Sequence, residues 1–98
     1  MRELRFDWDP AKDIANRDSH GVSFAEAQTV FSDELARFTH DPDHSNDEDR
    51  FLLLGLSSVL RLLVVCHCYR KSDEVIRIIS ARKATRKERR QYNQGWKK

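Results

Sequence analysis

The fold of this chain is decided by the stretch LLVVCHCY, which spans residues 62–69. Successive side chains of a β-strand point to opposite faces of a sheet. One face of this stretch carries Leu62, Val64, Cys66 and Cys68, and the other carries Leu63, Val65, His67 and Tyr69. Both faces are apolar in the middle, which is typical of a strand that is covered on both sides. We therefore predict that this stretch is the central strand of a sheet.

Further strands are predicted from apolar runs that are bounded by turn residues. Short turns around residues 57–58 and 71–73 join the central strand to its two neighbours, which favours antiparallel pairing. The additional predicted strands are Leu4–Trp8, Leu35–Thr39, Phe51–Leu56 and Val75–Arg82. In the last of these, simple alternation places Arg77 on one face and Ser80 and Arg82 on the other.

Two helices are predicted near the N-terminus from their capping residues. Asp9 followed by Pro10 is typical of a helix start, and Gly21 is typical of a left-handed C-terminal cap. The sequence SFAE at residues 23–26 has the capping-box pattern and opens a second helix. We expect that helix to end near residues 32–33.

A third helix is predicted at the C-terminus. The sequence TRKE at residues 85–88 is another capping box, and it opens a basic helix in which Tyr92 and Trp96 lie four residues apart. The complete order is then β-α-α-β-β-β-β-α. Strands clustered after paired helices predict an α+β fold with a small, mostly antiparallel sheet.

Length and composition are typical of one small domain covering residues 1–98. No segment approaches the roughly 18 apolar residues of a membrane span, and the first residues lack the apolar stretch of a secretory signal. We therefore expect a cytoplasmic protein without membrane association. Cys66 and Cys68 lie two residues apart on one strand, which is a poor arrangement for a disulfide, so we expect reduced thiols.

The net charge of +2 hides a strong division along the chain. Residues 1–59 contain 6 basic and 13 acidic side chains, a net charge of −7, whereas residues 60–98 contain 12 basic and 3 acidic side chains, a net charge of +9. Such asymmetry predicts one basic working surface on an acidic body. Nucleic acid is the natural partner of that surface, and an acidic protein is the alternative.

The basic charge is concentrated at residues 76–90, where a strand leads into the last helix. The free N–H groups and positive dipole end of a helix N-terminus favour phosphate binding. Arg77 lies between apolar neighbours inside the strand, so it needs a carboxylate partner or opens onto a site. The alternative interpretation of the whole segment is a solvated basic face without a ligand.

Several segments share their residues and their order with a known family. They are FDWDPAK at 6–12, Asn16, HGVSFAEA at 20–27, VF at 30–31, DPDHS at 41–45, RF at 50–51, GLS at 55–57 and the stretch 76–92. This pattern resembles the BrnT family (DUF497), the toxins of bacterial type II toxin–antitoxin modules. The family often has Lys immediately before the histidine at position 20, where this chain has Ser19.

The resemblance implies a RelE/ParE-like α+β fold and a metal-independent endoribonuclease activity that arrests translation. It further implies RNA as the substrate and a cognate BrnA-like antitoxin that covers the basic groove in a hetero-oligomeric complex. RNA cleavage without a metal uses the 2′-hydroxyl as nucleophile, with a base, an acid and cations that stabilise the developing phosphate charge.

Candidate residues can be assigned to these roles. Arginine binds phosphate through a bidentate fork, and His20 titrates in the range needed for proton transfer. The predicted catalytic residues are Arg77, Arg82, Arg86 and His20. The predicted RNA-binding residues are Lys12, Lys83, Lys87, Arg89 and Arg90.

The proton-transfer groups stay open at this point. His20 could instead cap its helix, and His67 on the central strand is typical of a packed core histidine. Glu88 is also explained by the capping box, and Tyr92 by packing against Trp96.

No metal site or cofactor is predicted. The HDPDH sequence at residues 40–44 is better explained as an acidic loop. Strand alternation separates His67 from the two neighbouring cysteines, so one ion could not collect all three side chains. The alternative function is a non-catalytic module that binds nucleic acid or an acidic partner.

Overall fold

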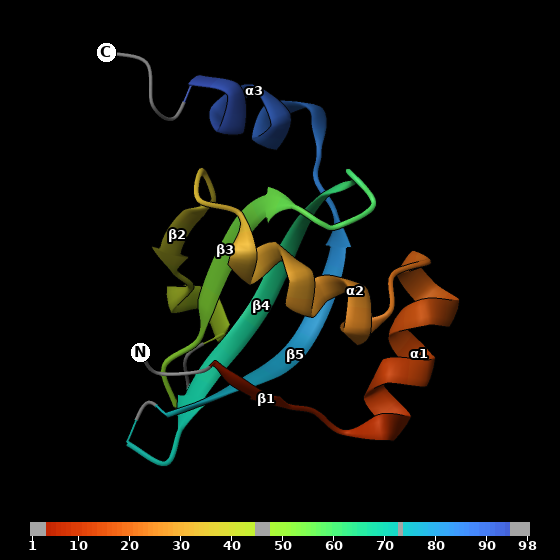
Figure 1. Ribbon diagram of the computed structural model, residues 1–98, viewed down its shortest axis with the longest axis vertical. Helices are drawn as coiled ribbons and strands as arrows, with labels where there is room; N and C mark the ends of the chain where they lie inside the picture. Colours follow the sequence, from red (N-terminus) through yellow and green to blue (C-terminus); the bar gives the residue numbers. More distant parts are fainter. Residues whose placement is uncertain (1–3, 45–47, 73, 95–98) are drawn as a thin grey trace.

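The computed structural model describes residues 4–44, 48–72 and 74–94, and its fold is the predicted α+β arrangement (Figure 1). Three helices accompany one five-stranded sheet with the strand order β1-β5-β4-β3-β2. The strands are β1 (Arg5–Asp7), β2 (Arg37–His40), β3 (Phe51–Leu56), β4 (Leu62–Arg70) and β5 (Val75–Lys83). The helices are α1 (Pro10–His20), α2 (Phe24–Thr29) and α3 (Arg86–Gln94), with 3₁₀ turns η1 (Val30–Ser32) and η2 (Pro42–His44).

The predicted central strand, β4, is confirmed as the middle strand of the five. It pairs antiparallel with β3 and β5, β2 pairs antiparallel with β3, and only β1 runs parallel to its neighbour β5. Seven consecutive residues of β4 are buried, from Leu62 to Cys68. Both of its faces are therefore covered over most of its length, as its composition indicated.

Two hydrophobic clusters lie on opposite faces of the sheet. On one face, α2 and η1 place Phe24, Ala27 and Val30 over the central strands, all at 0% exposure. Figure 1 shows α2 crossing this face. On the other face, Tyr92 of α3 packs with Leu54 and with neighbouring residues of β4. The last helix is thereby held against one end of the sheet.

Helix α1 lies beside β5, where the edge of the sheet needs a partner (Figure 1). Strand β1 pairs only with the first residues of β5, from Val75 to Arg77. Further along, the buried side chain of Asn16 accepts from the Ala81 N–H at 3.1 Å and donates to the Ala81 carbonyl at 2.8 Å. The amide therefore replaces a missing strand at this position. By contrast, Ile14 on the same helix is 54% exposed.

The predicted caps of α1 are confirmed, but the capping box predicted for α2 forms only in its Ser23 half, because the Glu26 carboxylate binds Ser57 and Arg61. Asp9 accepts from the Ala11 N–H at 2.9 Å, and Gly21 ends α1 with a φ of 68°. The Ser23 hydroxyl accepts from the Glu26 N–H at 3.0 Å. Helix α2 ends at Thr29, and the 3₁₀ turn η1 continues it to Ser32, close to the predicted end at residues 32–33. Trp96, the predicted packing partner of Tyr92, lies outside the described residues.

The predicted distribution of side chains on β5 is wrong at one point. The register pairs Ser80 with Cys66 but Ile78 with His67, so Ile79 is an extra residue in the ladder. Such a β-bulge resets the alternation of the strand. Arg77 consequently shares a face with Ser80 and Arg82, instead of pointing to the opposite side. This single inserted residue brings the two arginines onto one surface.

Candidate functional site

The bulge in β5 adds Arg77 to a sheet face that also carries three other arginines. Arg77 and Arg82 lie opposite Cys68 and Val64 of β4, and Arg37 of β2 lies opposite Leu54 of β3. Arg50 immediately precedes β3, and its positive charge acts on both Cys66 and Cys68 of this face. We call this surface the arginine face, defined by Arg37, Arg50, Arg77 and Arg82. It is the face opposite α2.

A groove of about 480 Å³ lies on the arginine face beneath α3. Its floor is sheet, and one wall is the exposed side of the last helix. It is lined by Arg37, Phe38, Thr39, Leu52, Leu54, Val64, Glu88 and Gln91. Arg37 donates from Nη1 to the Gln91 carbonyl at 2.7 Å, which ties β2 to the last turn of α3. This hydrogen bond joins the two elements that border the groove.

Arg82 is bound in a bidentate pair by Glu88. Its Nη1 and Nη2 donate to Oε1 and Oε2 at 2.7 and 2.8 Å, and the side chains are 41% and 22% exposed. The Arg82 guanidinium lowers the pKa of Glu88 from 4.5 to about 2. Glu88 also completes the predicted capping box, since Thr85 N–H donates to it and its own N–H donates to the Thr85 hydroxyl. The Arg82 guanidinium, which was predicted to bind phosphate, is therefore already paired with the Glu88 carboxylate.

Arg77 has the looser of the two carboxylate partners. Its Nη1 lies 3.2 Å from Asp7 Oδ1 on the neighbouring strand β1, and the two side chains are 32% and 48% exposed. A half-exposed pair of this kind contributes little to stability, so an incoming phosphate can compete for the guanidinium. We predicted that Arg77 either pairs with a carboxylate or opens onto a site. Its pairing with Asp7 meets the first of these two conditions.

With one exception, the other predicted cations lie at the end of the sheet where β5 leads into α3. Arg86 begins α3, Lys83 ends β5, and both are exposed, as are Lys87, Arg89 and Arg90. His20 ends α1 and is exposed, and the carbonyl of the next residue, Gly21, accepts from Arg61 Nη2 at 3.0 Å, just before β4 begins. Lys12 is exposed near the opposite end of α1, so the structure does not bring it to the Arg82–Arg86 region.

Among the proton-transfer candidates, three are engaged in ways that suit structure better than catalysis. Glu88 stays ionised, with a pKa of about 2. Burial and a 2.7 Å hydrogen bond to Asp33 raise the pKa of Tyr92 to about 12. His67 is completely buried, and this burial lowers its pKa. His20 is the exposed member of the four, whereas the Glu88 side chain is 22% exposed.

The two alternative metal interpretations concern the stretch from Cys66 to Cys68 and the loop at residues 40–44. Cys66 and Cys68 are free thiols on the arginine face, whereas His67 lies on the other face, as predicted. His40 instead contacts Asp49 at 3.3 Å. Across residues 4–44, 48–72 and 74–94, no three His, Cys, Asp or Glu side chains are grouped to hold an ion. No helix in those ranges is long and apolar enough to cross a membrane.

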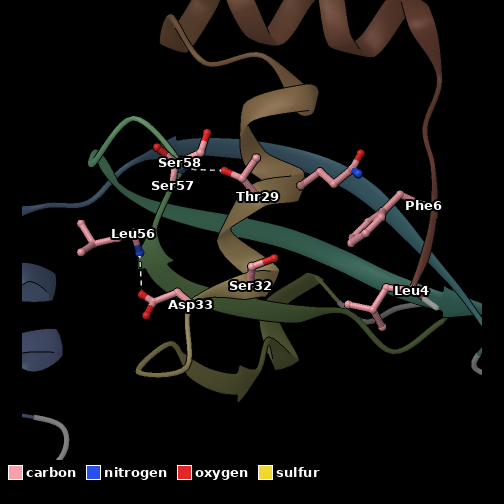
Figure 2. Close-up of a pocket in the computed structure, with 9 residues that line it drawn as sticks. Leu4, Phe6, Thr29, Ser32, Asp33, Leu56, Ser57 and Ser58 are labelled. Carbon is pink, nitrogen blue, oxygen red and sulfur yellow. Dashed lines mark hydrogen bonds between the residues drawn. The ribbon is translucent and has the colours of Figure 1, made fainter. Parts of the chain in front are cut away.

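A second hollow, of about 680 Å³, runs along α2 on the opposite face and is drawn in Figure 2. Two of its polar side chains, Thr29 and Asp33, are used in structural hydrogen bonds. Thr29 accepts from the Ser58 N–H, and Asp33 accepts from the Leu56 N–H, both at 2.8 Å. Although burial opposes ionisation of Asp33, the Leu56 and Tyr92 hydrogen bonds lower its pKa. This hollow therefore offers no free acid or base.

Sequence reasoning missed Arg37 and Arg50 as members of the candidate site. Both were visible as basic residues in an otherwise acidic half, but their place depends on pairing with strands far along the chain. Alternation back from Leu52 places Arg50 on the face of Val64, whereas Arg37 reaches that face through its pairing with Leu54. The bulge that adds Arg77 to that face has no comparable sequence signal.

The sequence and the structure of this chain are both similar to those of known proteins. A family model described as ribonuclease toxin, BrnT, of type II toxin–antitoxin systems matches residues 8–88. The chain is also similar to the crystal structure of the Brucella abortus ribonuclease toxin BrnT, with a TM-score of 0.62 and 23% identity, over 86% of this chain and 100% of that chain. A search of curated protein sequences gives no match. The structural likeness supports the fold, and the family match covers most of the sequence. The chain therefore belongs to the BrnT family of ribonuclease toxins of type II toxin–antitoxin systems.

Proposed function

We propose that this chain cleaves RNA on the arginine face without a metal ion, and that this cleavage arrests translation. The observation that carries the proposal is the bulge at Ile79, which collects Arg77 and Arg82 on one surface with Arg37. Several guanidinium groups on a common face can neutralise the charge that develops on a phosphate. They would supply the stabilisation that a metal ion supplies in other nucleases.

In this mechanism the RNA provides its own nucleophile. The 2′-oxygen loses its proton to a base and attacks the adjacent phosphorus, while the bond from phosphorus to the 5′-oxygen breaks and that oxygen receives a proton. The products are a 2′,3′-cyclic phosphate and a 5′-hydroxyl. Arg77, Arg82 and Arg86 are proposed to hold the non-bridging phosphate oxygens.

We assign one of the two proton transfers to His20. Its support is that it is solvent-exposed and that the next residue, Gly21, is bound by Arg61. Arg61 precedes Leu62, whose carbonyl accepts from the Ala84 N–H between β5 and α3. The exposed cations Lys83, Lys87, Arg89 and Arg90 would bind the flanking phosphates. Lys12 would then contact RNA only beyond the cleavage site, because it lies at the far end of α1.

Incubation of the purified chain with single-stranded RNA in excess EDTA tests the chemistry. We expect cleavage with cyclic phosphate ends, a loss of at least about 100-fold for Arg77→Ala and Arg82→Ala, and a weaker signal for His20→Ala. The matched control is Arg5→Ala, because Arg5 forms a comparable exposed pair with Glu74 at 3.7 Å on the same strand as Asp7. Absence of cleavage in EDTA, or full activity of both arginine variants, would refute the proposal.

Translation arrest is tested separately by adding the chain to a cell-free translation reaction. Wild-type protein should stop incorporation of labelled amino acid, whereas Arg77→Ala should not. Equal inhibition by both proteins would show that arrest does not depend on the arginine face.

A second candidate function, binding of an acidic protein segment, is favoured by the carboxylates already seated on this surface. Glu88 and Asp7 show that the guanidinium groups of Arg82 and Arg77 accept carboxylate partners. A BrnA-like antitoxin could use its own acidic residues in the same way and so cover the face in a hetero-oligomer. Co-expression with the neighbouring reading frame tests this, because a complex that survives Arg77→Ala together with Arg82→Ala would not use this surface.

A further inference from the structure

The face opposite the arginine face carries a cluster of aromatic rings around a buried histidine. His67 on β4 lies 4.8 Å from the Phe31 ring, 5.4 Å from Tyr69 and 5.9 Å from Phe38, measured between ring centroids. Phe38 and Phe51 are stacked at 5.0 Å with an interplanar angle of 21°. These rings come from three adjacent strands and from η1.

A pocket of about 650 Å³ opens over this cluster. We call it the aromatic pocket, lined by Phe38, Phe51, Tyr69, Glu48 and Asp49. Three aromatic rings and two carboxylates together form a surface that attracts positive charge, because ring faces carry a negative quadrupole. The same carboxylates repel phosphate, so this pocket suits a different ligand from the arginine face.

The carboxylates of the pocket have exposed charged partners, and Glu48 also forms a hydrogen bond with the buried thiol of Cys68. Asp49 lies 3.3 Å from His40, and Glu48 lies 3.6 Å from Arg70, with at least one-third of each of these four side chains exposed. Exposed pairs of this kind are weak. A cation that entered the pocket could therefore exchange with Arg70 or His40 at small cost.

His67 supplies a second, independent observation. It is 0% exposed, and its Nδ1 lies 3.1 Å from the Val65 carbonyl, which requires Nδ1 to be the protonated donor. Nε2 then carries a lone pair, and it finds no hydrogen-bond partner within the described ranges of the chain. A buried acceptor left without a donor is uncommon in native proteins. It lies among the three rings that line the pocket, and it is neutral, so it does not oppose a cation.

The position of the pocket indicates how a ligand would reach it. Strand β2 ends the sheet order, and all four of its residues are exposed, including Phe38 at 54%. An edge strand can pair with an extended segment of another protein. Alternate side chains of such a segment would lie on the face that carries Phe38.

We propose that the aromatic pocket binds an arginine or lysine side chain of a protein partner that docks along the edge of β2. This site lies on the opposite face of the sheet from Arg77 and Arg82, and Phe38 at the sheet edge is the lining residue that it shares with the groove on the arginine face. The pairing would place one basic side chain among the rings and close to the two carboxylates. A partner could thus hold the toxin without entering the arginine face.

The test uses a capped Thr-Arg-Thr peptide and the same peptide with neutral citrulline in place of arginine. Binding is followed by the NMR shifts of the Phe38, Phe51 and Tyr69 ring protons. We expect the arginine peptide to bind about fivefold or more tightly than the citrulline peptide. Phe38→Ala and Asp49→Asn should each weaken it by about threefold to tenfold. Leu35→Ala is the matched control, because Leu35 is similarly exposed, at 49%, just before β2.

Three results would overturn the proposal. They are equal binding of the citrulline peptide, unchanged binding by Phe38→Ala, and ring shifts produced by adenosine but not by the arginine peptide. The last result would identify the rings as a stacking surface for a nucleobase. Because Phe38 is exposed, its replacement should leave the fold intact, and the amide spectrum of the variant verifies this.

Discussion

Replacement of Glu88 by Gln removes the charge that holds Arg82 while keeping a side chain that can complete the capping box. The pKa of Glu88 falls from 4.5 to about 2 in the folded chain. Since each pKa unit corresponds to about 1.4 kcal/mol, the upper limit of the stabilisation is ~3 kcal/mol. The Arg82 side chain is 41% exposed, and solvent screening reduces the expected loss in Glu88→Gln to about 1–2 kcal/mol at pH 7.

The sign of the pH dependence follows from the lowered pKa. Stabilisation by Glu88 is fully present above pH 4.5, and it is lost as pH falls from 4.5 toward 2, because the unfolded chain takes up the proton first. Urea denaturation of wild type and Glu88→Gln at pH 7, 4.5 and 3 measures the difference in free energy of unfolding. We expect that difference to fall to about half or less at pH 3.

Thr85→Ala is the matched control, since it removes the hydroxyl cap and leaves the ion pair in place. It should cost about 1 kcal/mol at every pH tested. A difference between wild type and Glu88→Gln that is zero at pH 7, or that stays constant down to pH 3, would refute the argument. In Glu88→Gln, Arg82 loses its carboxylate partner, so this variant should bind single-stranded RNA more tightly than wild type although it is less stable.

Three further predictions concern buried polar groups. Asn16→Ala leaves the Ala81 N–H and carbonyl without their partners, so urea denaturation should show a loss of about 2–4 kcal/mol; a loss below 0.5 kcal/mol would contradict this estimate. Burial lowers the pKa of His67, so the Tm of wild type should fall as pH drops below 6.5, and the Tm of His67→Phe should fall less. If the two curves of Tm against pH are parallel, His67 is not responsible for the loss. Tyr92→Phe loses the 2.7 Å hydrogen bond to Asp33, at a cost of about 1–2 kcal/mol. In wild type, ultraviolet titration should show one of the two tyrosines ionising near pH 12, and this step should vanish in the variant.

Local patterns predicted much of the fold because their physical causes are local. The caps at Asp9, Gly21 and Ser23 depend on residues within one helical turn, and all three are confirmed. The central position of β4 follows from a strand with two apolar faces, which can only be buried in the middle of a sheet. Asn16 had a role that no periodicity could reveal, since its partner Ala81 is 65 residues away.

For the candidate site, the amino-acid sequence by itself determined the concentration of basic charge after residue 60, the capping box that begins α3, and the family to which the chain belongs. Only the tertiary structure decided which arginines share a surface. Side-chain alternation has a period of two, so the one extra residue at Ile79 moves Arg77 to the face of Arg82. Whether such an inserted residue is tolerated depends on pairing with β4, and strand pairing is a property of the assembled sheet.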